Sequence, residues 1–351
     1  MHTFIRLDSD YTLSGHDDPC VVTTLSPLHS SDSCSYLYPI CEGPIPSKFS
    51  TTDEASICLE AITAQIFDLF DDLWLHTQST LSKKREMTSL EEDMENCLVR
   101  AALRTVELDS SHLEGIQEAR HKLRVWTIGF ASTSKTTKNL ISNLSTHMFF
   151  FCVWIWAEAW RDPTAMLVDR FHTQFEHMVS LCEQYVETHI AKTPFCGSFL
   201  AHGSSQTARL TTPPAFSLGS GVVTCLIAIV ERCRDSSTRQ RCISTMRKIN
   251  LRGVFDTEYL VAYLLAIVEL EEGAAQLLSG GTCAVGALRP DEVPEAARTL
   301  EVVMSPSCCV SNFDFYKMRE GSIIHVGNTC DDYGNALGLG DPMVRTFRLS
   351  T

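Results

Sequence analysis

The sequence predicts a mainly α fold, an array of packed antiparallel helices that ends in a small C-terminal β-hairpin. Apolar residues recur at spacings of three and four through much of the chain, the pattern of helices with one buried face. Hydrophobic residues make up 44% of the 351 positions, which is enough for a large core. The hairpin is predicted by two strand-like runs, 310–317 and 322–327, on either side of Arg319-Glu320-Gly321, where glycine suits a tight turn.

Composition divides the chain into three parts. Residues 1–48 are rich in Ser, Thr, Asp and Pro and are expected to form a disordered leader. Residues 49–305 carry the helical periodicity and form the predicted helical domain. Residues 306–351 hold the predicted hairpin and a tail rich in Gly and Asp.

The first helix is expected to start after Phe49-Ser50, where hydroxyl residues are followed within one turn by acids, and to run towards Trp74. A polar connection is expected over 77–88. The next predicted helices are, in chain order, 90–108, 112–130 after an Asp109-Ser110-Ser111 link, 140–159, and 164–190 after Asp162-Pro163, with a short helix near 291–304.

The stretch 216–272 organises the chain and predicts three further helices. An apolar run over 222–230 forms the first, and Asp235 is the expected N-cap of the second, which runs to about Ile249. Asp256 is expected to cap the third. Because residues 259–268 are ten apolar residues in succession, this third helix should be covered on more than one side and lie at the centre of the domain.

The candidate site is the one basic cluster in an acidic chain, whose formal net charge is −14. The face of the second helix opposite Cys242, Ile243, Met246 and Ile249 is expected to carry Arg239, Arg241, Arg247 and Lys248. One hypothesis is that the cluster docks an acidic partner surface, and the alternative is a solvated face paired within the chain. The residues proposed for partner docking are Arg234, Arg239, Arg241, Arg247 and Lys248.

The same stretch resembles a known family. Its features are, in order, Cys233-Arg234-Asp235, an amphipathic helix, the loop Arg252-Gly253-Val254-Phe255-Asp256 and the closing Val268-Glu269-Leu270-Glu271-Glu272. This order is similar to that of the C-terminal regulatory region of fungal zinc binuclear-cluster (Zn₂Cys₆) transcription factors. The resemblance covers roughly residues 49 to 330. It implies a helical effector region in the nucleus that modulates transcription, for instance of a secondary-metabolite gene cluster, and contacts other transcription regulators or a second copy of itself.

The DNA-binding part of that family has no counterpart in the sequence. No six-cysteine run of the form Cys-x₂-Cys-x₆-Cys is present. A net charge of −14 also argues against a broad basic surface for phosphates. We therefore predict no direct, specific DNA binding by this chain. Either the gene model has lost its 5′ end, or the protein acts through partners.

Two other functions were weighed. One alternative is a helical enzyme of the terpene-synthase type, which is suggested by Asp68, Asp71 and Asp72. Against it, position 75 is Leu75 and no second magnesium-binding motif follows. The other alternative is a small-molecule sensor, because the aromatic residues of 149–160 could line a ligand pocket. These residues could instead serve core packing. No catalytic, cofactor-binding or metal-binding residue is predicted.

The fifteen cysteines are scattered, often within apolar helical runs. This usage favours free thiols in a reducing compartment over a disulfide framework. The N-terminus lacks the apolar core of a signal peptide, and the longest apolar runs are about ten residues, well under the roughly eighteen that span a bilayer. An intracellular protein without a membrane span is expected, in the nucleus by resemblance and otherwise in the cytoplasm.

Overall fold

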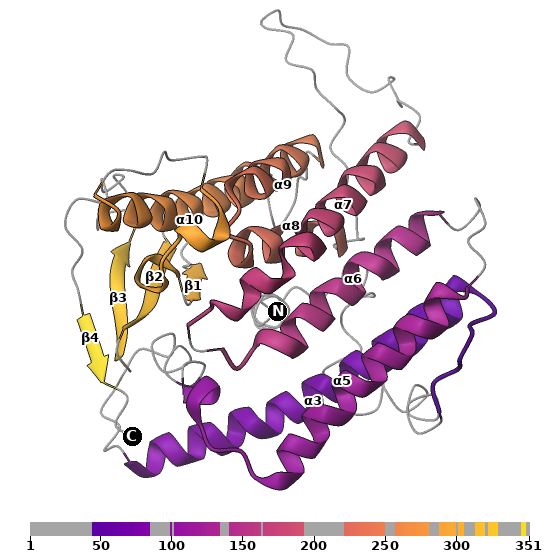
Figure 1. Ribbon diagram of the computed structural model, residues 1–351, viewed down its shortest axis with the longest axis horizontal. Helices are drawn as coiled ribbons and strands as arrows, with labels where there is room; N and C mark the ends of the chain where they lie inside the picture. Colours follow the sequence, from indigo (N-terminus) through magenta and orange to yellow (C-terminus); the bar gives the residue numbers. More distant parts are fainter. Residues whose placement is uncertain are drawn as a thin grey trace, which may run out of the picture.

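The computed structural model confirms the predicted mainly helical class (Figure 1). It describes residues 44–84, 99, 102–133, 140–162, 164–192, 221–249, 257–280 and 288–299, together with the strand segments 301–304, 313–319, 322–328 and 345–348. Most of the predicted leader, residues 1–43, lies outside the described residues. Within its last part, Ile45 already packs against a core cluster.

Helices α3 (Thr52–Lys84) and α5 (Ser110–Ala131) form one antiparallel layer, drawn in indigo to purple in Figure 1. Three cross-helix contacts show the register, because Trp126 donates to the carbonyl of Ala55, Lys122 to Gln65, and His112 lies near His76. The predicted hydroxyl cap of α3 is confirmed, since Thr51 Oγ1 accepts from the Glu54 amide at 3.0 Å.

The predicted end of α3 was wrong. The helix continues to Lys84, through most of the stretch that was expected to be a polar connection. Thr77 is buried, and its hydroxyl donates to the carbonyl of Leu73 at 2.8 Å, so the polar side chain is satisfied within the helix. A run of polar residues therefore did not mark a helix end here.

Helix α6 (Leu140–Ala159) has the predicted bounds and lies between the α3–α5 layer and the helices that follow it in the chain (Figure 1). Phe150 and Val153 belong to the core cluster shared with α3 and α5. Met148 and Ile155 belong to the cluster shared with α7, α8, α9 and α10. The central element is therefore α6, because its opposite sides are both covered by other helices.

The predicted helix over 164–190 starts later and in two steps. A 3₁₀ turn, η3 (Leu167–Phe171), leads into α7 (His172–Lys192). The Asp162 carboxylate accepts the amide hydrogens of Thr164 and Leu167, which holds the intervening turn in a non-helical shape. Ala165 within that turn has a positive φ of 55°.

The three helices predicted within 216–272 are present as α8 (Gly221–Arg232), α9 (Ser236–Ile249) and α10 (Thr257–Leu278). The proposed cap Asp256 lies outside the described residues. Helix α10 is mostly buried, as expected, but it is not the centre of the domain, since Leu265 in its apolar run is 41% exposed. It also continues to Leu278, beyond the stretch 216–272 in which it was predicted.

After α10 the described segments are short turns and strands instead of long helices. Two 3₁₀ turns, η4 (Pro290–Glu292) and η5 (Glu295–Ala297), and strand β1 (Glu301–Met304) occupy the place of the helix that was predicted near 291–304. Strands β2 (Phe313–Arg319), β3 (Ser322–Asn328) and β4 (Arg345–Arg348) follow. The sheet order is β1-β2-β3-β4, with every neighbouring pair antiparallel.

Candidate functional site

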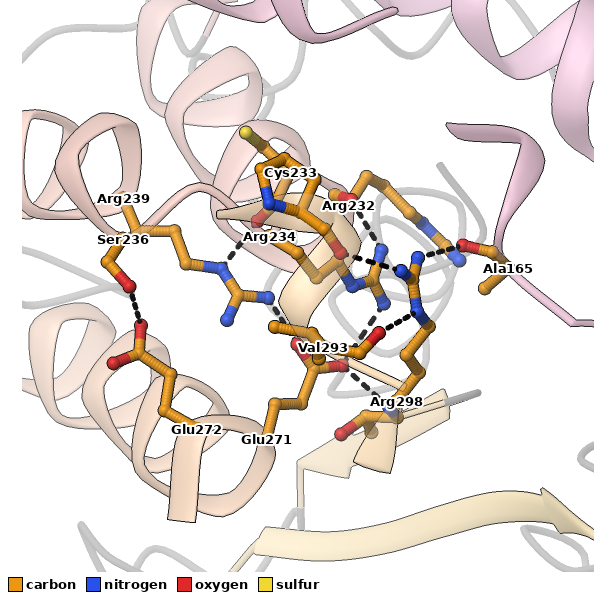
Figure 2. Close-up of polar contacts among 12 residues, drawn as sticks. Ala165, Arg232, Cys233, Arg234, Ser236, Arg239, Glu271, Glu272, Val293 and Arg298 are labelled. Atoms are coloured by element: carbon orange, nitrogen blue, oxygen red, sulfur yellow. Dashed lines mark hydrogen bonds and ion pairs between the residues drawn. The ribbon is translucent and has the colours of Figure 1, made fainter. Parts of the chain in front are cut away.

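A buried polar network lies where the corner between α8 and α9 meets α10 and the chain segment 288–299 (Figure 2). Helix α8 ends at Arg232 and α9 begins at Ser236. The predicted N-cap is confirmed, because Asp235 Oδ1 accepts from the Thr238 amide at 2.7 Å and also from the Thr238 hydroxyl. This cap sets the direction of α9, and the corner holds two arginines against α10.

Arg234 and Arg239 both bind the carboxylate of Glu271. Arg234 Nη2 lies 3.1 Å from Glu271 Oε1, and Arg239 Nη2 donates to Glu271 Oε2. All three side chains have 0% exposure. The backbone of the corner adds to the arginine contacts, since the carbonyls of Arg232 and Cys233 accept from Arg234 and Arg239, respectively. Figure 2 shows both guanidinium groups converging on Glu271.

Glu271 stays ionised in this environment. Burial alone raises the pKa of its carboxyl, but the charges of Arg234 and Arg239 and the hydrogen bonds from Arg239 and the Thr299 amide outweigh burial and lower the pKa to about 2. Burial lowers the pKa of Arg234, and Glu271 opposes that change. A guanidinium group remains protonated in proteins. The network therefore keeps fixed charges at neutral pH.

A second link joins the start of α9 to the chain after α10. The Ser236 hydroxyl donates to the buried Glu272 carboxylate at 2.7 Å and accepts from the Leu288 amide at 3.0 Å. The Ser236 amide in turn donates to the Leu288 carbonyl at 3.0 Å. The adjacent acids Glu271 and Glu272 thus each hold a different part of the α8–α9 corner.

Arg298 connects the same region to η3. Its guanidinium donates to both carboxylate oxygens of Asp169, at 3.0 and 2.6 Å, and to the carbonyl of Ala165 at 2.6 Å. The carbonyls of Val293 and Pro290 accept its remaining hydrogens. The Arg298 side chain is only 1% exposed. One arginine therefore ties three separate turns together, and it donates to the carbonyl of Ala165, the residue with the positive φ.

The structure divides the predicted docking residues into three kinds. Arg234 and Arg239 are fully buried, so neither can contact a partner, and the prediction that Arg239 covers the outer face of α9 was wrong. Arg241 is partly exposed and forms a two-bond ion pair with Glu183, at 3.1 and 2.7 Å. Arg247 and Lys248 are exposed near the end of α9. Of the five, these last two and the outer part of Arg241 can reach a partner.

Helical spacing contained the signal for the buried charges. Arg239 stands three and four positions before Cys242 and Ile243, so it belongs to the apolar stripe of α9 and not to the opposite face. Glu271 likewise stands seven positions after Leu264 and four after Ile267, which are both buried. A charged residue on each of two buried stripes indicates an ion pair between the helices. Arg298 and Asp169 carried no comparable signal.

The residues behind the other two hypotheses lie in different surroundings. Asp68, Asp71 and Asp72 are exposed on α3. Burial and the nearby Asp72 raise the pKa of Asp68. No group of three or more His, Cys, Asp or Glu side chains that could hold a metal ion occurs among the described residues.

The aromatic residues of α6 are packed on one another and on neighbouring helices. Phe150 stacks on Trp126 with ring centroids 4.9 Å apart, and the ring centroids of Trp156 and Phe70 are 4.5 Å apart. Trp154 meets Phe171 edge-on at 5.3 Å. These contacts join α6 to α3, α5 and η3, so the aromatic cluster serves core packing in the structure.

No family model, no curated protein and no solved structure matches the chain. Within the described ranges, no helix is long and apolar enough to cross a lipid bilayer.

Proposed function

We propose that the chain is a regulatory module of the kind found in fungal zinc-cluster transcription factors, and that it acts by contacting protein partners. The proposal includes a nuclear location, control of genes such as a secondary-metabolite cluster, no catalysis, and no direct, specific DNA binding by this chain. It rests on one observation. The residues that carry the family resemblance, Cys233 to Asp235 and Glu271 to Glu272, meet in a single buried network.

The contacts of that network suit a rigid scaffold that holds a binding surface in place. Arg234 and Arg239 are held by Glu271 and by backbone carbonyls, and Glu271 does not titrate near neutral pH. Such a network fixes the relative positions of α8, α9 and α10. It leaves the outer face of α9 to interact with other molecules.

The outer face of α9 supplies the contact surface that we propose. Ser244, Arg247 and Lys248 are exposed there, and Arg241 lies partly exposed one turn earlier. A basic patch on a chain of net charge −14 favours an acidic partner surface, because opposite charge speeds encounter and disfavours other partners. Other transcription regulators, or an acidic face of a second copy, fit this chemistry.

A tethering experiment tests the function. The full chain is fused to an unrelated DNA-binding domain and expressed with a reporter gene that carries the matching site. We expect reporter output to differ from that of the DNA-binding domain alone, in either direction. The double variant Arg247→Glu/Lys248→Glu should bring the output back towards the baseline, whereas Arg124→Glu, which reverses an exposed charge on α5, should not.

Two results would count against the proposal. A full-length fusion whose reporter output equals that of the DNA-binding domain alone removes the regulatory function. A sequence-specific footprint obtained with the purified chain contradicts the prediction that it does not bind DNA itself.

A further inference from the structure

Two cysteines from neighbouring helices face each other in the core. Cys152 of α6 and Cys225 of α8 have their sulfur atoms 3.4 Å apart, with the Cys152 thiol donating to Cys225. The helices pack directly on each other, and Cys225 belongs to the core cluster against which Cys152 packs. A disulfide bond is about 2.05 Å long, so the two sulfur atoms need to approach by only about 1.4 Å.

The pair differs from the other cysteines in access. Six cysteines lie on the residues whose side chains the structure describes, and of these Cys152 is the one that is only partly buried. Cys225 is 1% exposed. Cys152 is thus the member of the pair that a small oxidant can approach from solvent, and Cys225 is covered by the surrounding core. Cys182 offers a comparison, because its sulfur is fully buried and lies 3.3 Å from Met148 Sδ.

We propose that Cys152 and Cys225 form a reversible oxidation site, at which hydrogen peroxide converts the two thiols into a disulfide that links α6 to α8. The inference stands independently of the proposed function.

The chemistry proceeds in two steps that balance. Peroxide transfers one oxygen to the Cys152 sulfur, its O–O bond breaks, and one water leaves, so that Cys152 becomes a sulfenic acid. The Cys225 sulfur then attacks the Cys152 sulfur, the S–O bond breaks, and the departing hydroxide takes the Cys225 proton as a second water. Two thiols lose two electrons in total and one peroxide becomes two waters. A dithiol reductant reverses the link by thiol–disulfide exchange.

The order of the two steps follows from the surroundings. The hydrogen bond from Cys152 and burial raise the pKa of the Cys225 thiol well above its usual range, so Cys225 stays protonated and shielded. Burial likewise raises the pKa of Cys182 and of Cys242 well above the usual range. Oxidation should therefore start at Cys152 and be completed by the nearest thiol, Cys225.

The test uses the full chain, purified with its thiols reduced and then treated with hydrogen peroxide under native conditions. Remaining thiols are blocked before digestion, and peptides are mapped by mass spectrometry with and without dithiothreitol. We expect one dominant cross-linked peptide pair that contains Cys152 and Cys225 and disappears on reduction. The variant Cys225→Ala should instead leave a sulfenic acid at Cys152 that dimedone traps, and the matched control Cys182→Ala should still form the link.

The wild-type peptide map decides the matter even if a variant fails to fold. A map in which Cys152 remains a free thiol at peroxide levels that oxidise other cysteines would overturn the proposal. So would dimedone-labelled Cys152 without the Cys225 link in the wild-type chain.

Discussion

Arg239 of α9 and Glu271 of α10 form an ion pair in which neither side chain reaches solvent. The two residues lie 32 positions apart, and Arg234 adds a second arginine to the same carboxylate. A buried ion pair is not in itself strong evidence of stability, because desolvation offsets much of the attraction. Removing one arginine is different, since it takes a hydrogen-bonded partner from a carboxylate that stays charged in the core.

Substitution within this pair should therefore destabilise the fold strongly. We expect Arg239→Met to lower the free energy of unfolding by about 1.5–3 kcal/mol, because Glu271 keeps its charge but loses one of its two arginine partners. The control is Arg241→Met, which breaks a partly exposed pair with Glu183 and should cost less than about 1 kcal/mol. Urea unfolding followed by circular dichroism measures both. Equal losses in the two variants would refute a stabilising role for the buried pair.

Acid sensitivity should follow from Glu271. Its pKa is about 2 in the folded chain, below the ordinary value of 4.5, so the stability it contributes is complete above about pH 4.5 and is lost as pH falls towards 2. The difference corresponds to roughly 3 kcal/mol. We expect Glu271→Gln to be less stable than the wild type at pH 6 and to show a flatter decline below pH 4.5. The measurement is the difference between urea unfolding curves over this range, and parallel declines would contradict it.

Two helical glycines should respond in opposite ways to alanine. A Cβ atom at Gly129 of α5 would lie 2.5 Å from the Pro46 carbonyl oxygen and 2.9 Å from Phe49 Cε2, so Gly129→Ala should destabilise by about 1–3 kcal/mol. A Cβ at Gly273 of α10 meets no described atom within 4 Å. Gly273→Ala should stabilise by about 0.5–1 kcal/mol through helix propensity. Thermal unfolding distinguishes the two signs, and a stabilised Gly129→Ala variant would show that the close approach is absent.

The Arg298 junction, by which we mean the contacts of Arg298 with Asp169 and with the carbonyl of Ala165, should require a guanidinium group. Lysine keeps the charge but cannot form the two-bond contact with Asp169 while also reaching the Ala165 carbonyl. We expect Arg298→Lys to lower the free energy of unfolding by about 1.5–3 kcal/mol. Arg289→Lys is the matched control, because Arg289 is 68% exposed beside Asp291 and should change stability by less than about 0.5 kcal/mol. Similar stabilities for the two variants would argue against the junction.

Local patterns predicted much of the fold. The bounds of α6, the three helices α8, α9 and α10, and the capping role of Asp235 followed from apolar spacing and short-range cap chemistry. Polar runs were less informative. They suggested an end for α3 near Trp74, but Thr77 satisfies its hydroxyl on the preceding turn and the helix continues to Lys84.

The sequence by itself determined where most helices of the described domain lie and most of their apolar positions, because both depend on residues within a few turns of each other. Only the tertiary structure decided that Arg234 joins Arg239 on Glu271, that α6 and not α10 is central, and that Arg298 reaches Asp169. Each of these depends on which distant segment covers a helix face. An arginine enters a core only where a carboxylate from elsewhere in the chain meets it, and at this corner Glu271 does so.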